Sequence, residues 1–307
     1  MKRYGTLAAT VAATAMLAGC GGGGGGETGT TKPPKAADPA KTLAQVYNDG
    51  KILNATHTTA ARIDTKKGTV GGEKWAEFSV QGQSATNDFL LTLEGLTSTF
   101  TDEERSEDWI WQWESMDDLG MYFECWTCPD ATWLWATHAG RRIAASTNQF
   151  TNGFAIIGLP TANFDNVPVR ATYQSVRGSQ GRFGAILYMR PAENYDIEDR
   201  EVYFGDTALV ADFTNQTLSG RLFNFEDEDG ELWSAFKLEM PETTFNTEGF
   251  SGHFDVSGVR SGVSSLAYEG SFYGPEAQEI GGVISGTVVG GDNSTIFLTT
   301  GMFAGTQ

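Results

Sequence analysis

The feature that most constrains the fold is a series of short segments, in the second half of the chain, in which apolar and polar residues alternate. Turn-forming residues separate these segments, as at Asn215–Gln216 and from Gly290 to Asn293. Because successive side chains of a strand point to opposite faces, the pattern predicts antiparallel strands joined by hairpins. The expected strands cover residues 168–175, 183–189, 201–204, 207–213, 217–225, 232–240, 249–259, 264–273, 280–288 and 294–303.

Helical periodicity is rare by comparison, and only Thr42–Tyr47 fits a short helix. The first half of the chain also alternates in places, as in the segment Glu73–Val80. A chain with this many strands is expected to form a sandwich or a closed barrel, and closure removes the unpaired strand edges. We predict an all-β protein, in which a small antiparallel β domain over residues 42–152 precedes an eight-stranded antiparallel β-barrel over residues 153–307.

The predicted barrel needs an apolar interior. A barrel of about eight strands has an interior that side chains can fill completely. The alternation along the strands places apolar residues on the inner face, namely Val210, Phe213, Leu222, Phe236 and Ile284.

The chain is strongly acidic, with 39 acidic and 21 basic residues and a net charge of −18 at pH 7. Binding to nucleic acid or to anionic lipid needs a basic surface, so we expect no nucleic-acid partner and no polybasic contact with a membrane. The sequence holds only three histidines and three cysteines, and we expect neither a metal site nor a cofactor.

The first twenty residues have the pattern of an export signal. Lys2 and Arg3 precede an apolar stretch, Leu7–Leu17, that is too short to span a bilayer. The sequence Leu-Ala-Gly-Cys that ends at Cys20 resembles the lipobox of bacterial lipoproteins. The resemblance implies a signal peptide over residues 1–19, cleavage before Cys20 and acylation of that cysteine; the alternative is an ordinary secretory signal with a chance cysteine.

Residues 20–41 have the composition of a flexible tether. Six consecutive glycines, Gly21–Gly26, are followed by three prolines and have almost nothing to bury. A phosphate-binding loop is not indicated, because no Lys-Ser or Lys-Thr pair directly follows the glycines and no strand precedes them. With a lipidated Cys20, this segment would join the folded part to a membrane.

One segment of the second half resembles a known family. Residues Gly270–Gly282 read G-S-F-Y-G-P-E-A-Q-E-I-G-G, which is similar to the signature of the β-barrel domain of transferrin-binding protein B. Ala208–Phe213 followed by Thr217–Gly220 resembles a hairpin of that family, and Gly158–Thr161 resembles the entry into its barrel. In the signature, Gly274 and Pro275 suit the turn, and we expect Gly281 and Gly282 to permit a bend or bulge in the next strand.

The resemblance implies a surface lipoprotein of the bacterial outer membrane, with one lobe made of a handle-like β domain and a barrel. The classical family member has two such lobes, so transferrin itself is not specified as the ligand. Related one-lobe lipoproteins bind haemoglobin or complement factor H. We therefore expect a non-enzymatic protein that binds a protein or an iron source and takes part in iron acquisition, with an outer-membrane transport partner. The alternative is a structural or protective surface lipoprotein.

Tryptophans are concentrated before the barrel, with seven of the eight between Trp75 and Trp135. At strand spacing they form two stripes, which either pack in a core or make an exposed aromatic platform for a protein ligand. The candidate ligand-binding residues are Trp109, Trp111, Trp113, Trp133 and Trp135.

Cys125 and Cys128 form a C-x-x-C motif. An exported protein meets an oxidising environment, which favours a short disulfide at the end of a hairpin. A thioredoxin-like site would need the motif at the start of a helix, and a zinc site would need two further ligands. We therefore predict a disulfide between Cys125 and Cys128.

Histidine is the remaining candidate for ligand chemistry. His57, His138 and His253 could each ligate haem iron, which is the alternative to an ordinary polar role. The sequence contains no Gly-x-Ser-x-Gly and no His-Glu-x-x-His motif, and we expect no catalytic residues.

The lipobox gives a direct prediction. The change Cys20→Ser removes the acylated thiol, so the protein should be released from membranes or accumulate as an uncleaved precursor. Membrane fractionation and the mass of the isolated protein measure this. An unchanged distribution and an unchanged mass would contradict lipidation at Cys20.

Overall fold

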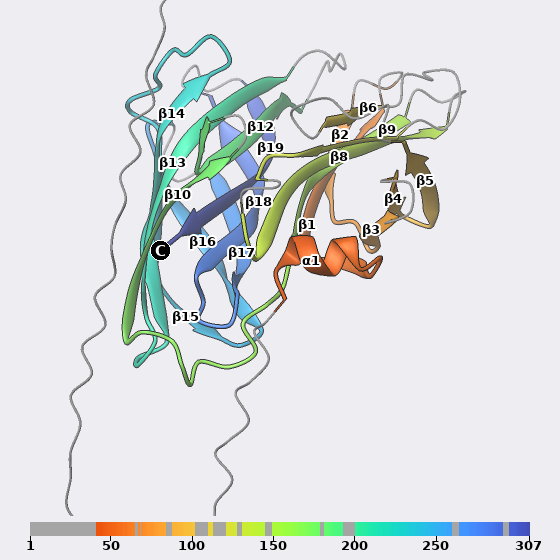
Figure 1. Cartoon of the computed structure of the whole chain (residues 1–307). Coiled ribbons are helices and arrows are strands. Elements are labelled where there is room, and N and C mark those ends of the chain that lie inside the picture. Colours follow the sequence, from red (N-terminus) through yellow and green to blue (C-terminus); the bar gives the residue numbers. More distant parts are fainter. Residues whose placement is uncertain are drawn as a thin grey trace, which may run out of the picture. The chain divides into compact units, whose positions relative to one another are not determined.

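The computed structural model describes residues 41–64, 67, 69–83, 88–101, 110–112, 121–127, 131–144, 149–178, 181–192, 200–259, 264–290 and 295–307 (Figure 1). Residues 40–307 belong to one compact unit. Cys20 and the predicted signal peptide and tether lie outside the described residues, except for Lys41. No helix within the described ranges combines the length and the apolar character needed to cross a membrane.

The short helix α1 (Leu43–Asn48) lies where the sequence predicted one. Its N-cap is Thr42, whose side chain accepts a hydrogen bond from the backbone N–H of Gln45, while the Gln45 side chain accepts one from the backbone N–H of Thr42. This reciprocal capping satisfies two backbone donors that a helix end would otherwise leave unpaired.

The first sheet contains nine strands, all paired antiparallel. β1 (Ile52–Asp64) is at its centre and pairs with β9 on one side and with β3 and β2 on the other. The order across the sheet is β5 (Leu96–Phe100), β4 (Asp88–Leu93), β3 (Phe78–Gln83), β1, β9 (Gln149–Gly158), β8 (Leu134–Ala144), β7 (Met121–Cys125) and β6 (Ile110–Gln112), with β2 (Thr69–Glu73) beside β1.

The second sheet closes into an eight-stranded antiparallel barrel, as the sequence predicted. Closure arises because β13 pairs with β14 as well as with β10 and β12. Its strands are β10 (Arg170–Gly178), β11 (Gly181–Phe183), β12 (Ala185–Pro191), β13 (Glu201–Asp212), β14 (Thr217–Asp227), β15 (Lys237–Asn246), β16 (Gly249–Ser257), β17 (Ser265–Tyr273), β18 (Glu279–Val289) and β19 (Ile296–Thr306).

Two strands share one place in the barrel wall. β10 and β12 both lie between β13 and β19, and they follow one another along these neighbours. Gln174 is opposite Ala208 of β13, and Ala185 is opposite Gly205 of the same strand. After Ser175, which still pairs with β19, residues 176–178 of β10 leave the wall and pair with β11.

Aromatic side chains fill the barrel interior. Phe272 makes ring contacts with five neighbouring aromatic residues, and the segment between β9 and β10 adds Phe164, whose ring meets Phe272 edge-on. Of the interior residues predicted from the sequence, Phe213, Leu222, Phe236 and Ile284 are buried there, and Val210 is not. Phe213 continues the inward face of β13 that holds Leu209 and Ala211, whereas Val210 lies on the opposite face, because positions three residues apart cannot share a face of a strand.

The boundary between the two sheets does not lie at residue 153, where the sequence predicted a domain boundary. β9 spans that position and belongs to the first sheet, because it pairs with β1 and β8. The barrel begins with β10 at Arg170. The predicted strands 201–204 and 207–213 are one strand with a bulge between Phe204 and Asp206, and β15 begins at Lys237 instead of residue 232.

The packing around Phe272 gives a stability prediction. Phe272→Ala leaves a cavity among five aromatic rings and should lower the free energy of unfolding by about 3–5 kcal/mol. The matched control is Phe223→Ala on β14, where a half-buried ring contacts Arg221 and about 1 kcal/mol is expected. Urea unfolding measures both, and equal losses would contradict an interior centred on Phe272.

Candidate functional site

Several polar contacts between distant parts of the chain lie where the first sheet meets the barrel wall. We call this region the junction and define it by strands β1, β8 and β9 with residues 126–127 and 131–133 on one side, and strands β12, β17, β18 and β19 on the other. An apolar layer in the junction contains Phe154 and Ile156 of β9 with Ile186, Val283 and Met302 of the barrel. Figure 1 shows β8 and β9 beside β18 and β19.

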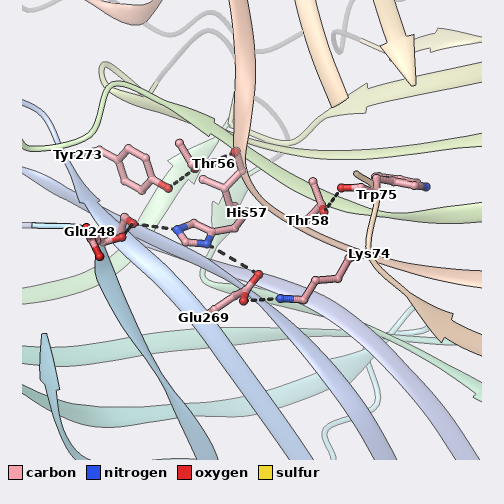
Figure 2. Close-up of polar contacts among 10 residues, drawn as sticks. Thr56, His57, Thr58, Lys74, Trp75, Glu248, Glu269 and Tyr273 are labelled. Carbon is pink, nitrogen blue, oxygen red and sulfur yellow. Dashed lines mark hydrogen bonds and ion pairs between the residues drawn. The ribbon is translucent and has the colours of Figure 1, made fainter. Parts of the chain in front are cut away.

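His57 connects β1 to strand β17 of the barrel (Figure 2). Its Nε2 lies 2.8 Å from Oγ of Ser271, and its Nδ1 lies 3.9 Å from Oε1 of Glu269. The other carboxylate oxygen of Glu269 binds Nζ of Lys74. His57, and after it Lys74, stabilise the ionised carboxylate, which lowers the pKa of Glu269 to about 2 despite partial burial.

Ser271, His57 and Glu269 follow the order hydroxyl, imidazole and carboxylate that is familiar from hydrolytic triads. The geometry differs from that of an activated nucleophile. The distance of 3.9 Å from Nδ1 to the carboxylate exceeds a hydrogen bond, and the carboxylate is shared with Lys74. Ser271 is almost fully buried within β17, and its Oγ also donates to the backbone carbonyl of Glu248. The arrangement therefore suits attachment of the first sheet better than catalysis.

Glu279 is a second attachment. It is the first residue of β18, and its carboxylate accepts hydrogen bonds from three consecutive backbone N–H groups, those of Thr132, Trp133 and Leu134, at 2.8–2.9 Å. Burial raises the pKa of Glu279, and the three N–H donors offset part of that rise. One side chain of the barrel thus holds the start of β8.

The glycines of the signature make room for these contacts. Gly274 has a positive φ of 86°, and a Cβ there would lie 2.8 Å from the ring of Trp133. The expected bend at Gly281 and Gly282 is wrong, because β18 keeps a regular register through both residues. A Cβ at Gly282 would collide with the Phe303 ring inside the barrel, so this glycine is needed for close packing.

His138 lies deep in the junction. Its Nε2 is 2.8 Å from the Tyr122 hydroxyl, and its Nδ1 is 3.4 Å from the hydroxyl of Tyr188 on barrel strand β12. Nδ1 also lies 3.6 Å from the Glu124 carboxylate. Burial lowers the pKa of His138 to about 4, and Glu124 opposes part of that shift. Burial also raises the pKa values of Tyr122 and Tyr188, so all three groups are neutral near pH 7.

The predicted tryptophan sites occupy different environments. Trp135 is 2% exposed and lies in the core of the first sheet. Packing in a core was the alternative to an exposed aromatic platform. Trp133 precedes β8 and packs against the junction, so the two do not form one stripe. Trp111 belongs to β6, but its side chain lies outside the described residues, as do Trp109 and Trp113.

The cysteine motif lies at the end of β7. Cys125 is buried and disulfide-bonded. Cys128 lies outside the described residues, and the pairing of Cys125 with Cys128 stays a prediction. The intervening Trp126 contacts Phe204 of the barrel, and the side chain of Thr127 accepts a hydrogen bond from the backbone N–H of Ala136. The described part of the motif, Cys125–Thr127, therefore lies at the edge of the junction.

The histidines considered for haem differ in accessibility. Both ring nitrogens of His57 and of His138 face protein partners, whereas His253 is exposed on β16. Within the described ranges, no group of three or more His, Cys, Asp or Glu side chains is placed to hold a metal ion.

Comparison with known proteins identifies the barrel. Residues 168–307 match the family model described as the C-lobe and N-lobe β-barrels of transferrin-binding protein B. This part of the chain is a transferrin-binding protein B-like β-barrel domain. No curated protein matches the sequence.

Solved structures of transferrin-binding protein B from Haemophilus parasuis Hp5, a vaccine antigen, are also similar. A tryptophan-to-alanine mutant has 17% identity and a TM-score of 0.41, and a double mutant has 16% identity and a TM-score of 0.45. Each match covers 81% of this chain and 45% of the other, so the chain spans about half the length of these relatives. A protein of unknown function from Nostoc punctiforme PCC 73102, of the DUF3598 family, has 9% identity and a TM-score of 0.20, with 85% and 97% covered.

Sequence reasoning missed most of the junction residues. Glu269, Ser271 and Tyr273 alternate along β17, and each has a polar contact to β1. This period of two within the signature was a usable signal, because every second residue of a barrel strand faces outward. For His57 and His138 the sequence carried no comparable signal, since Ser271 is 214 residues from His57 and Tyr188 is 50 residues from His138.

The contacts of Glu279 give the next prediction. In Glu279→Gln the side-chain amide has one acceptor oxygen, and its NH₂ group would face the N–H donors of residues 132–134. We expect the free energy of unfolding to fall by about 1.5–3 kcal/mol, with a lower melting temperature in calorimetry. Glu239→Gln, at an exposed position of β15, is the matched control and should melt like the unmodified protein. Equal melting of both variants would contradict this role.

Proposed function

We propose that this protein is a lipid-anchored protein of the bacterial outer-membrane surface that captures a protein ligand and catalyses no reaction. The barrel domain supports the proposal through its relation to a family of binding proteins. The lipobox ending at Cys20 and the tether that follows support anchoring. A tethered domain can meet large ligands outside the cell without inserting into the bilayer.

The observation that carries the proposal is the filled barrel. Phe225, Phe236, Phe272 and Phe303 are at most 3% exposed in its interior. The described interior is therefore occupied by side chains, in contrast to barrels that enclose a ligand. Recognition falls to the outer surface and the connections between strands, which is where a protein ligand binds.

The connections of the barrel differ between its two ends. At one end they are the turns of residues 213–216, 247–248 and 274–278. At the other end they cover residues 192–200, 228–236, 258–264 and 290–295. We propose that the ligand binds at the end with the longer connections, because variable loops held by a rigid scaffold are the usual site of recognition.

The ligand class is supported by the similarity of the barrel to those of transferrin-binding protein B. We propose an iron-carrying host protein, transferrin-like or haemoglobin-like, and transfer to an outer-membrane transport partner. The tryptophans at positions 109, 111 and 113 stay candidates for the contact, whereas the buried Trp135 is a poor one. A structural or protective role without a ligand is the competing proposal, and the experiment below separates the two.

Ligand capture tests the proposed function. The mature chain, immobilised through an added C-terminal tag, is exposed to purified transferrin, purified haemoglobin and whole serum. We expect one protein to be retained, and at least tenfold less of it when residues 260–263 and 291–294 are replaced by Gly-Ser repeats. Surface amounts should also rise when cells grow with little iron.

The matched control changes the opposite end of the barrel. Thr247–Glu248 joins β15 to β16 and is replaced by Asn-Gly, which suits a two-residue hairpin turn. This variant should retain the ligand fully. Retention of no protein by the unmodified chain would overturn ligand capture, and equal loss in both variants would overturn the assignment to the longer connections.

A further inference from the structure

A neutral histidine is enclosed between the two sheets, in a region to which the proposed function assigns no part. We propose that the junction is acid-sensitive and that it loosens when His138 takes up a proton. The proposal stands on the position of the ring between two structural elements and is independent of which ligand the protein binds.

The ring of His138 faces both sides of the junction. From the first sheet it meets Tyr122, Glu124 and Phe154, and from the barrel it meets Tyr188, whose ring centroid is 4.6 Å away. The ring is 2% exposed. Any separation of the barrel from the first sheet therefore brings His138 into water.

Two arginines make a positive charge on the His138 ring unfavourable. The guanidinium groups of Arg190 and Arg200 lie over the ring of Tyr188, at 5.2 and 5.0 Å from its centroid. Both act on His138 in the direction that opposes protonation. Glu124 acts in the opposite direction, but burial outweighs it. A protonated His138 would thus be a poorly compensated cation in a dry contact.

The sign of the pH effect follows from linkage. Burial lowers the pKa of His138 from 6.5 to about 4 while the junction is closed. Because the open form binds the proton more tightly, closure is strongest above pH 6.5 and weakens as the pH falls toward 4. With a pKa of 6.5 in the open form and about 4 in the closed form, the equilibrium constant for opening is about 30-fold larger at pH 5.0 than at pH 7.5.

Other titratable groups of the junction do not produce the same change in this range. Glu269, which faces His57 and Lys74, has a lowered pKa and weakens closure mainly below pH 4.5. Glu279 has a raised pKa, so protonation favours its buried position and opposes opening. Tyr122 and Tyr188 stay neutral throughout, because burial raises their pKa values. Among these groups, His138 is the one whose protonation weakens closure between pH 7.5 and 5.0.

A direct measurement on the unmodified full chain is histidine titration by NMR. The signals of His57, His138 and His253 are assigned through His138→Gln and His253→Gln. We expect the His138 ring to stay neutral down to about pH 5. A His138 titration at or above pH 6.5 would overturn the proposal even if the His138→Gln variant folds poorly.

Opening itself is measured through a thiol placed in the junction. Met302→Cys introduces it at a buried position of the outer barrel wall, and Ile284→Cys introduces one in the barrel interior. The rate of modification by a methanethiosulfonate, relative to an unprotected peptide thiol at the same pH, reports how often each position is exposed. The same chain without an added thiol corrects for the natural cysteines.

When the pH is lowered from 7.5 to 5.0, the protection of the Met302→Cys thiol against modification should fall about 30-fold. The protection of the Ile284→Cys thiol should fall much less. In the His138→Gln background the pH dependence of the junction thiol should disappear, whereas His253→Gln, at an exposed position of β16, should preserve it. Equal loss at the two thiols would show global unfolding and overturn the proposal. Persistence of the full pH dependence in His138→Gln would also overturn it.

Discussion

The backbone ladder that closes the barrel is the interaction on which the other features depend. β13 completes the ring by pairing with β14 on one side and with β10 and β12 on the other. Closure lets the interior fill with aromatic rings and gives the outer wall a fixed shape. Glu279 and Tyr188 project from this wall and bind the first sheet. Their contacts require that the barrel strands keep one register.

The signature segment is constrained on both faces. Phe272 and Ile280 point into the barrel interior, while Ser271 and Glu279 bind the first sheet. Since alternate residues of a strand serve different neighbours, a short stretch here must satisfy core packing and the junction together. This double requirement gives a physical reason for a recognisable pattern of aromatic, glycine and acidic residues at this place.

Much of the barrel could be predicted from the sequence, because its strands obey a local rule of alternation. One error was a misapplied rule: Val210 was assigned to the same face as Phe213, although a spacing of three residues puts the two on opposite faces. The other was the domain boundary, since β9 belongs to the first sheet although the sequence pattern changes at residue 153. The contacts of the junction could not be predicted from the sequence. The partners of His57 and His138 depend on how the two sheets pack against each other, and no spacing along the chain encodes that packing.

The divided place in the barrel wall has a practical consequence. Between Ser175 and Ala185 the chain departs from the wall and returns to the same neighbours, β13 and β19, without breaking closure. Additional sequence at this point lengthens an excursion and leaves the paired strands in place. The barrel therefore has a natural insertion point, where a reporter or a foreign epitope can be displayed while the fold is retained.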